Sequence, residues 1–202
     1  MTKSIITIGR QYGSGGREIG EKLAKELGIP FYDKELLTIA AKKSGIAEEF
    51  FESNDEKPTS SLLYSIVTGN YGGDSLPFNH KLFLAQFDAI RSIAKKGPCV
   101  IIGRCADYAL EDYDNVVNVF IHADLDVRVK RAIKEYNIEN VKVAEQVSKI
   151  DKKRAHYYNF YSGRKWGSLE NYDLTVDSGI LGIDNTVELI KKFVELKDSL
   201  RK

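Results

Sequence analysis

One stretch near the start of the chain, residues 4–20, constrains the fold more than any other. It runs Ser-Ile-Ile-Thr-Ile-Gly-Arg-Gln-Tyr-Gly-Ser-Gly-Gly-Arg-Glu-Ile-Gly. Isoleucines at positions 5, 6 and 8 are typical of a buried strand in a parallel sheet, and the glycine-rich residues 13–16 interrupt that strand. From residue 17 on, apolar residues repeat at helical spacing, at Ile19, Leu23, Ala24 and Leu27. Gly28 is a typical helix terminator. The sequence therefore predicts a strand, a glycine loop and a helix.

A strand, a glycine loop and a helix in this order form a phosphate-binding geometry. Residues without a Cβ atom let backbone N–H groups face a ligand, and the helix N-terminus adds partial positive charge. Arg17 supplies a full charge at the mouth of the helix. A flexible turn that is merely rich in glycine is the alternative, but the position of the loop and the helix after it favour a phosphate site. The predicted cofactor-binding residues are Gly13, Ser14, Gly15, Gly16, Arg17 and Glu18.

The loop departs from the Walker A pattern G-x-x-x-x-G-K-[ST]. With Gly16 and Arg17 aligned to its Gly-Lys pair, Gln11 stands at the first glycine. Glu18 then replaces the hydroxyl residue that normally holds Mg²⁺, and it also stands where the dinucleotide pattern G-x-G-x-x-G requires its third glycine. Asp33 ends the predicted second strand as a ribose-binding acid would, so a dinucleotide-binding fold is weakened but stays open.

Composition limits the partners that the chain can have. With 202 residues, of which 43% are hydrophobic and 29% charged, the chain is long enough for one α/β domain with a substantial core. A net charge of +1 gives no overall field for nucleic acid or a membrane surface, so we expect neither partner and only local basic sites. No apolar run approaches the ~20 residues that span a bilayer. Because the chain enters a strand almost at once, we expect no signal peptide.

Cysteine and histidine residues point to a reducing compartment and to no metal centre built by the protein. Cys99 and Cys105 are the only cysteines, and Cys99 lies in an apolar strand, which favours a buried thiol over a disulfide. That usage is typical of a cytoplasmic protein. The histidines, His80, His122 and His156, show no spacing of metal ligands.

The rest of the chain alternates between strands and helices. Further strands are predicted at residues 29–32, 99–102, 116–121 and 174–176. Helices are predicted at residues 34–43, 47–52, 81–96 and 141–161, after Asp124, and after Asn185 as an N-cap. This alternation implies a parallel sheet. Residues 53–80 are the least regular part, and we interpret them as a mobile insert on the substrate side.

Charged residues follow two of the predicted strands at the edge where doubly wound sheets bind ligands. Asp33 is either a ligand-facing acid or the N-cap of the next helix, and both roles stay open. Arg104 directly follows a buried strand, which is costly unless something pairs with it. One explanation for Arg104 at this position is an ion pair with Asp107 or Asp33. The second explanation, which we favour, is that Arg104 binds an anion.

Basic residues gather late in the chain. Arg128 with Arg131, and Lys153 with Arg154, could be solvated helix faces, but a phosphate loop and a strand-end arginine accompany them. That combination favours a phosphoryl-transfer enzyme whose lid, at about residues 128–166, closes over the site. Asp151 is the only acid between residues 146 and 168. We therefore expect the lid charges to be incompletely paired and the lid to be open without ligand.

In this order the motifs resemble the cytidylate kinase-like family, within the P-loop nucleoside-monophosphate kinases. Residues 6–19 resemble the family's Ile-Thr-Ile-x-x-x-x-Gly-Ser-Gly-Gly-Arg-Glu-Ile, and residues 31–34, Phe-Tyr-Asp-Lys, resemble the end of its second strand. Residues 100–104, Val-Ile-Ile-Gly-Arg, followed by Asp107, are similar to a Gly-Arg-Asp stretch. Residues 150–154 are similar to the lid and residues 174–178 to the last strand.

The resemblance implies a single three-layer P-loop NTPase domain whose five parallel strands have the order 2-3-1-4-5, with helices on both faces. It implies ATP on the glycine loop and a pyrimidine monophosphate, (d)CMP, as acceptor. Asp33, Gly103, Arg104 and Asp107 would bind the acceptor, and Arg17, Arg128, Arg131 and Arg154 would act in catalysis.

Two departures from the family pattern concern Mg²⁺ and phosphate. The Walker lysine and hydroxyl residue are missing, and Ile102 stands where true cytidylate kinases carry an aspartate before Gly-Arg. We therefore expect Mg²⁺ to be held mainly by the nucleotide, with at most one carboxylate from Glu18, Asp33 or Asp107. The competing hypothesis is a nucleotide-binding protein or sensor that kept the fold and lost catalysis.

Overall fold

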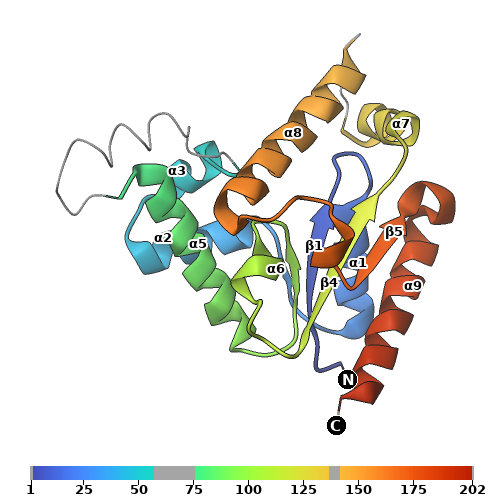
Figure 1. The fold of residues 1–202 in the computed structure, drawn as a ribbon, viewed down its shortest axis with the longest axis horizontal. Coiled ribbons are helices and arrows are strands. Elements are labelled where there is room, and N and C mark those ends of the chain that lie inside the picture. The colour runs from blue at the N-terminus through green and yellow to red at the C-terminus, as the bar shows by residue number, and fades with distance from the viewer. Residues whose placement is uncertain (1, 57–75, 137–141, 202) are drawn as a thin grey trace.

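The predicted strand, glycine loop and helix form the centre of the fold. The structure, a computed structural model, describes residues 2–56, 76–136 and 142–201. Strand β1 (Ile5–Arg10) leads through the glycine loop into helix α1 (Gly16–Leu27), which ends at Gly28 in the left-handed conformation (Figure 1). The buried isoleucines of β1 and the apolar face of α1 follow the sequence pattern.

The sheet has the strand order β2-β3-β1-β4-β5, and all four pairings are parallel. Its other strands are β2 (Phe31–Tyr32), β3 (Val100–Ile102), β4 (Val116–His122) and β5 (Leu174–Asp177). This confirms the predicted order 2-3-1-4-5. A dinucleotide-binding fold orders its strands 3-2-1-4-5-6, so the alternative that the sequence left open does not apply.

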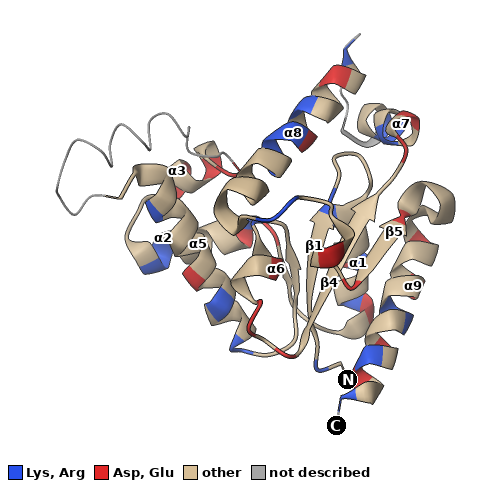
Figure 2. Ribbon diagram, in the orientation of Figure 1, with Lys and Arg blue, Asp and Glu red and all other residues tan. Residues whose placement is uncertain are grey.

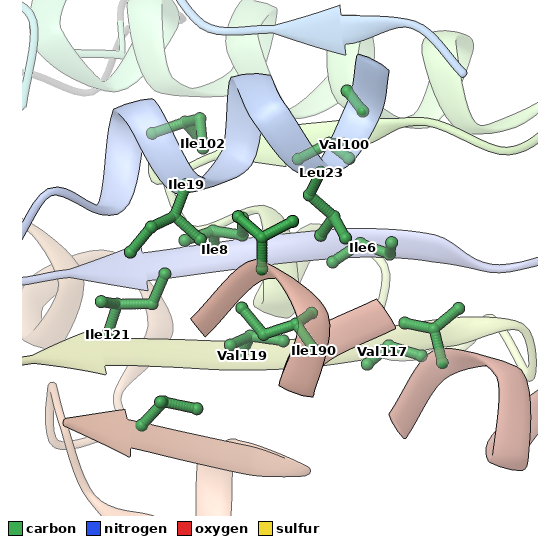
Figure 3. Packing of buried hydrophobic residues seen from close by; sticks show 14 residues of the cluster. Ile6, Ile8, Ile19, Leu23, Val100, Ile102, Val117, Val119, Ile121 and Ile190 are labelled. Carbon is green, nitrogen blue, oxygen red and sulfur yellow. The ribbon is translucent and has the colours of Figure 1, made fainter. Parts of the chain in front are cut away.

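Helices cover both faces of this sheet, because successive strand residues point to opposite sides. On one face, Ile6 and Ile8 pack with α1 and with α9 (Ser178–Leu200), as Figure 3 shows for Ile19, Leu23 and Ile190. The opposite face packs against α2 (Glu35–Ser44), α5 (Phe78–Ala94) and the short α6 (Ala106–Ala109). The result is the predicted three-layer arrangement.

The remaining helices lie at the carboxyl ends of the strands or beside them. Helix α3 (Glu48–Ser53) packs against α2, and α7 (Leu125–Tyr136) packs against α8 (Val143–Ser162). Figure 1 shows α7 and α8 above the β1–α1 loop. A single 3₁₀ turn, η1 (Leu169–Asn171), precedes β5. No helix of the described residues is long and apolar enough to cross a membrane.

The start of the last helix differs from the sequence prediction. Asp177, not Asn185, is the N-cap, and its carboxylate accepts a hydrogen bond from the Gly179 amide at 2.8 Å. The helix is kinked at Gly182, whose φ of 73° is not helical. Asn185 lies beyond this kink and donates to the Leu181 carbonyl. Two cap-type residues flank a glycine here, and the earlier one starts the helix.

Most of the predicted insert, residues 53–80, lies outside the described residues. Its first residues finish α3 and the turn after it, and its last ones already belong to α5, which begins three residues before the predicted position 81. Pro77 stands at the N-cap of α5, where its missing N–H costs the helix nothing.

Candidate active site

A cleft of about 540 Å³ opens at the carboxyl edge of the sheet between β1, β2 and β3. Its volume falls in the range typical of small-ligand sites. It collects seven of the predicted site residues: Gly13, Gly15, Gly16, Arg17, Asp33, Arg104 and Arg154. Arg10, Gln11, Tyr12, Lys34, Asp55, Glu56 and Ile102 also line it. Ser14, within the loop, and Arg131, which donates to the Gly13 carbonyl, do not line the cleft, and Gly103 and Asp107 line a second, smaller cavity.

The glycine loop is shaped by its backbone. Gly15 is the N-cap of α1 with φ 81°, and no side chain caps the helix there. The first N–H groups of a helix have no partner within it, so this end can accept an anion. The fully buried Ser178 hydroxyl donates to the Ser14 carbonyl at 2.6 Å, which ties the loop to the end of β5. The loop therefore has a fixed position on the sheet.

Arg17 and Glu18 are both paired with other side chains, and only Arg17 lines the cleft. Arg17 donates to Asp33 at 2.8 Å and also pairs with Glu21, and its side chain is 56% exposed. The hydrogen bond to Asp33 raises the pKa of Arg17. Glu18 pairs with Lys22 on the outer surface of α1. Arg17 is thus the member of the pair that lines the cleft.

Arg104 is buried between two carboxylates. Its guanidinium donates to Asp33 at 3.2 Å and forks onto Asp55 at 3.0 and 2.8 Å. The sequence-based alternative of an ion pair with Asp33 is therefore present, whereas Asp107 is not its partner. Burial disfavours the charged guanidinium, but Asp55, Glu56 and Asp33 raise the pKa of Arg104 above its ordinary value.

Asp33 stays ionised inside this network. Burial alone would raise its pKa, but the charge of Arg104 and the hydrogen bond from Arg17 hold the pKa below its ordinary value. Lys34, not Asp33, is the N-cap of α2, and no side-chain bond caps that helix. Of the two roles left open for Asp33, the helix cap does not apply, and the carboxylate faces the cleft.

Arg10 and Arg154 share a third carboxylate, Glu56. Arg10 donates to one of its oxygens at 2.7 Å and Arg154 to the other at 3.0 Å. Arg154 also donates to the Arg10 carbonyl and lies over the Tyr12 ring, next to the glycine loop. Burial alone would raise the pKa of Glu56, but the two arginines hold it well below its usual range.

Arg128 and Asp151 fasten helices α7 and α8 to the glycine loop. Arg128 is buried and donates to the carbonyls of Ala123 and Tyr12 and, at 2.6 Å, to Asp151. Asp151 also accepts from the Tyr12 amide at 2.7 Å. Arg131 donates to the Gly13 carbonyl at 3.1 Å. In this arrangement Arg128 holds the loop and α8 together, and Arg131 lies directly against the loop.

The expectation that the lid charges are incompletely paired is wrong for three of the lid arginines. Arg128 pairs with Asp151, Arg154 with Glu56, and Arg164 with Glu111. The two last acids come from other parts of the chain, so counting charges within the lid helices misses them. Figure 2 shows the remaining basic residues along α8.

Replacing Arg128 with alanine should destabilise the protein. Asp151, whose side chain is only 13% exposed, would lose its charge partner, and breaking such a buried pair costs about 3–5 kcal/mol. For a chain of this size we expect the melting temperature to fall by roughly 6–20 °C in calorimetry. Lys192→Ala, which removes an exposed pair with Glu195, is the control and should change it little. An unchanged melting temperature in Arg128→Ala would contradict a fastening role.

Asp107 lies in the smaller cavity beside the cleft, next to Gly103 and below α8. It accepts a hydrogen bond from the Tyr158 hydroxyl at 2.6 Å. Burial raises the pKa of Asp107 despite this bond. Aromatic rings of α8 and of the segment after it, Tyr157, Tyr158, Trp166 and Tyr172, line one part of this cavity, and the charged side chains of Arg10, Glu56, Arg104 and Arg154 line another. Asp107 thus lies between an aromatic wall and the charged cluster of the cleft.

Among the described residues, no three histidine, cysteine or acidic side chains are grouped so as to hold a metal ion. The three carboxylates named as possible Mg²⁺ ligands are engaged elsewhere: Glu18 with Lys22, Asp33 with arginines and Asp107 with Tyr158. The donor set therefore fits a metal that arrives with a nucleotide better than one held by the protein alone.

Arg10, Asp55 and Glu56 line the cleft but were not predicted from the sequence. Arg10 is the last residue of β1 and lies within the motif of residues 6–19. Its position just before the glycine loop could have identified it as a site residue. Asp55 and Glu56 lie in the irregular segment after α3, and nothing in their spacing indicates their partners. Their role follows only from the folded chain.

The fold and this cleft have the architecture of the P-loop kinases. A solved structure of an uncharacterised protein from Eubacterium ventriosum is 30% identical, with a TM-score of 0.71 over 95% of this chain and 98% of that one. Shikimate kinase from Bacteroides thetaiotaomicron shares the fold, with a TM-score of 0.56 at 15% identity over 95% of this chain and 98% of that one.

The chain belongs to the cytidylate kinase-like family, which it matches over residues 5–180. A cytidylate kinase from Archaeoglobus fulgidus is 26% identical over 200 residues, 95% of each chain. Another from Ignicoccus hospitalis is 24% identical over 191 residues, 95% of this chain and 99% of the relative. The predicted family is confirmed, and the protein is a kinase that transfers phosphoryl groups.

Proposed function

We propose that this protein transfers the γ-phosphoryl group of ATP to a pyrimidine nucleoside monophosphate, with (d)CMP as the favoured acceptor. The observation that carries the proposal is the single cleft that joins the glycine loop to the arginines Arg10, Arg104 and Arg154. Two phosphate-bearing substrates need two adjacent anion-binding regions. The cytidylate kinases among its relatives support the choice of acceptor.

In this proposal the chain works by positioning and charge. The amides of the glycine loop and Arg17 hold the donor phosphates. Arg104, with Asp33 and Gly103 around it, forms the acceptor side, and Asp107 faces the acceptor from the smaller cavity. Arg131, which donates to the Gly13 carbonyl, and Arg154, which lies over the Tyr12 ring, stabilise charge on the transferred group. Mg²⁺, carried mainly by ATP, would neutralise phosphate charge.

A direct test measures ADP formation from ATP and Mg²⁺ against a panel of nucleoside monophosphates. The proposal expects the highest kcat/KM with CMP or dCMP. Turnover only with purine monophosphates would overturn the acceptor assignment. ATP binding without turnover on any acceptor would favour the second candidate, a nucleotide-binding protein or sensor. This candidate is worth testing because the Walker lysine and hydroxyl residue are replaced in this chain.

Arg104→Lys should weaken acceptor binding far more than ATP binding. Lysine keeps the charge but loses the fork that holds Asp55 and the bonds to Asp33. We expect KM for the acceptor to rise about tenfold or more, since one lost charge-assisted bond is worth about 1.5–3 kcal/mol. Titration calorimetry with ATP and steady-state kinetics separate the two affinities. Equal losses for ATP and acceptor would place Arg104 in a purely structural role.

A further inference from the structure

Glu56 occupies a place in the cleft that suits an anionic ligand. Its two carboxylate oxygens accept hydrogen bonds from different guanidinium groups, Arg10 at 2.7 Å and Arg154 at 3.0 Å. The neighbouring Asp55 takes the fork of Arg104. Two consecutive carboxylates thus engage three arginines, and forked contacts of this kind are also how arginine binds phosphate.

The arginine cluster needs an anion to be stable. Burial and the charge of Arg10 lower the pKa of Arg154, and Glu56 offsets part of that effect. Five cationic side chains line the cleft, namely Arg10, Arg17, Lys34, Arg104 and Arg154. The carboxylates that face them are Asp33, Asp55 and Glu56, so Asp55 and Glu56 provide most of the compensating charge.

The backbone indicates that the ion pairs hold Glu56 in place. Its φ of 52° lies in the left-handed region, which residues with a side chain rarely adopt. Glu56 comes after the end of α3, three residues beyond Ser53, so no helix fixes it. Such a conformation persists only where the surrounding structure holds it, so Glu56 would lose this support if another anion took Arg10 and Arg154.

We propose that Glu56 is an internal substitute for a phosphate group, and that a phosphate monoester must displace it from Arg10 and Arg154 before the active site is assembled. Displacement leaves Arg10 for the incoming phosphate. It also frees Arg154, which is otherwise held by Glu56, to turn toward the glycine loop. The identity of the monoester as the acceptor nucleotide rests on the proposed function, but competition between Glu56 and phosphate does not.

The test is phosphate binding by Glu56→Gln, measured by titration calorimetry with inorganic phosphate as the probe. Glutamine keeps the shape of the side chain and removes its charge. If Glu56 occupies the site in most molecules, phosphate can bind only to the small fraction of molecules whose site is open, and the apparent affinity for phosphate is lowered in proportion. Removing the charge of Glu56 should therefore tighten phosphate binding about tenfold or more. Glu111→Gln, which removes the partner of Arg164 outside the cleft, is the matched control and should bind phosphate like the wild type.

Two results would overturn the proposal. Weaker phosphate binding in Glu56→Gln would mean that Glu56 orients the arginines for the ligand, and unchanged binding would mean that it does not compete. Glu56→Asp, which shortens the side chain and keeps the charge, provides a second variant. The melting temperature of each variant shows whether that variant is folded. Arg10→Gln should abolish the gain in phosphate binding that Glu56→Gln produces.

A kinetic measurement separates this proposal from the proposed function. If the enzyme is active, Glu56→Gln should lower KM for the acceptor and leave KM for ATP unchanged. If no nucleoside monophosphate is turned over, the assignment of function fails, while tighter phosphate binding in Glu56→Gln would still support displacement.

Discussion

Arg154→Ala should reduce turnover about 10³-fold or more while changing the affinity for ATP only modestly. An arginine that meets the transferred phosphoryl group contributes mainly in the transition state, and such residues are worth about 10³–10⁵ in kcat. Arg154 lies over the ring of Tyr12 and donates to the Arg10 carbonyl, so it is next to the glycine loop. Turnover under saturating substrates and ATP titration by calorimetry are the measurements.

The structure provides a matched control for this experiment. Arg164 is also a lid arginine paired with a distant acid, Glu111, but neither residue lines the cleft. Arg164→Ala should therefore keep nearly normal turnover. Arg154→Lys, which keeps the charge without the planar fork, should fall between the wild type and alanine. Normal turnover in a folded Arg154→Ala protein would show that the residue only pairs with Glu56.

The fold was predictable because its signals are local. The alternation of buried strands with amphipathic helices gave five parallel strands, and the glycine loop fixed where the chain passes from β1 into α1. The resemblance supplied the strand order. Errors fell at helix ends, where two candidate caps, Asp177 and Asn185, lie eight residues apart with a glycine between them. Local sequence cannot decide which of two adequate caps is used.

The site was only partly predictable, because its charges are paired over long distances. Position at a strand end was enough to find Asp33 and Arg104, and the motif was enough to find the loop. Glu56, however, is 46 residues from Arg10 and 98 from Arg154. No periodic pattern connects residues so far apart. Counting acids within the lid therefore predicted incomplete pairing for Arg154 and Arg164, which the folded chain pairs with acids from outside the lid.

Gly15→Val should abolish measurable ATP binding while the protein still folds. Gly15 is the N-cap of α1 at φ 81°, where a side chain is strained by about 1–2 kcal/mol. A Cβ atom there would lie 2.4 Å from Ile183 Cδ1 and 3.0 Å from an Arg131 nitrogen. Both atoms are at the ends of side chains that can move, so the fold should tolerate the change. The loop amides would be covered, and two lost charge-assisted bonds lower affinity about 100-fold or more.

Two other glycines of the same region make this prediction specific. Gly28, at the other end of α1, has φ 65° and nothing within 4 Å of an added Cβ atom. Gly28→Val should therefore share the backbone strain and lower the melting temperature without affecting ATP binding. A Cβ atom at Gly13 would instead meet the Arg128 carbonyl oxygen at 2.5 Å, a backbone atom that cannot move aside, so Gly13→Val should fail to fold stably. The valine side chain would cover the amides of the glycine loop. If folded Gly15→Val nevertheless bound ATP as the wild type does, the glycine loop would not be the phosphate site.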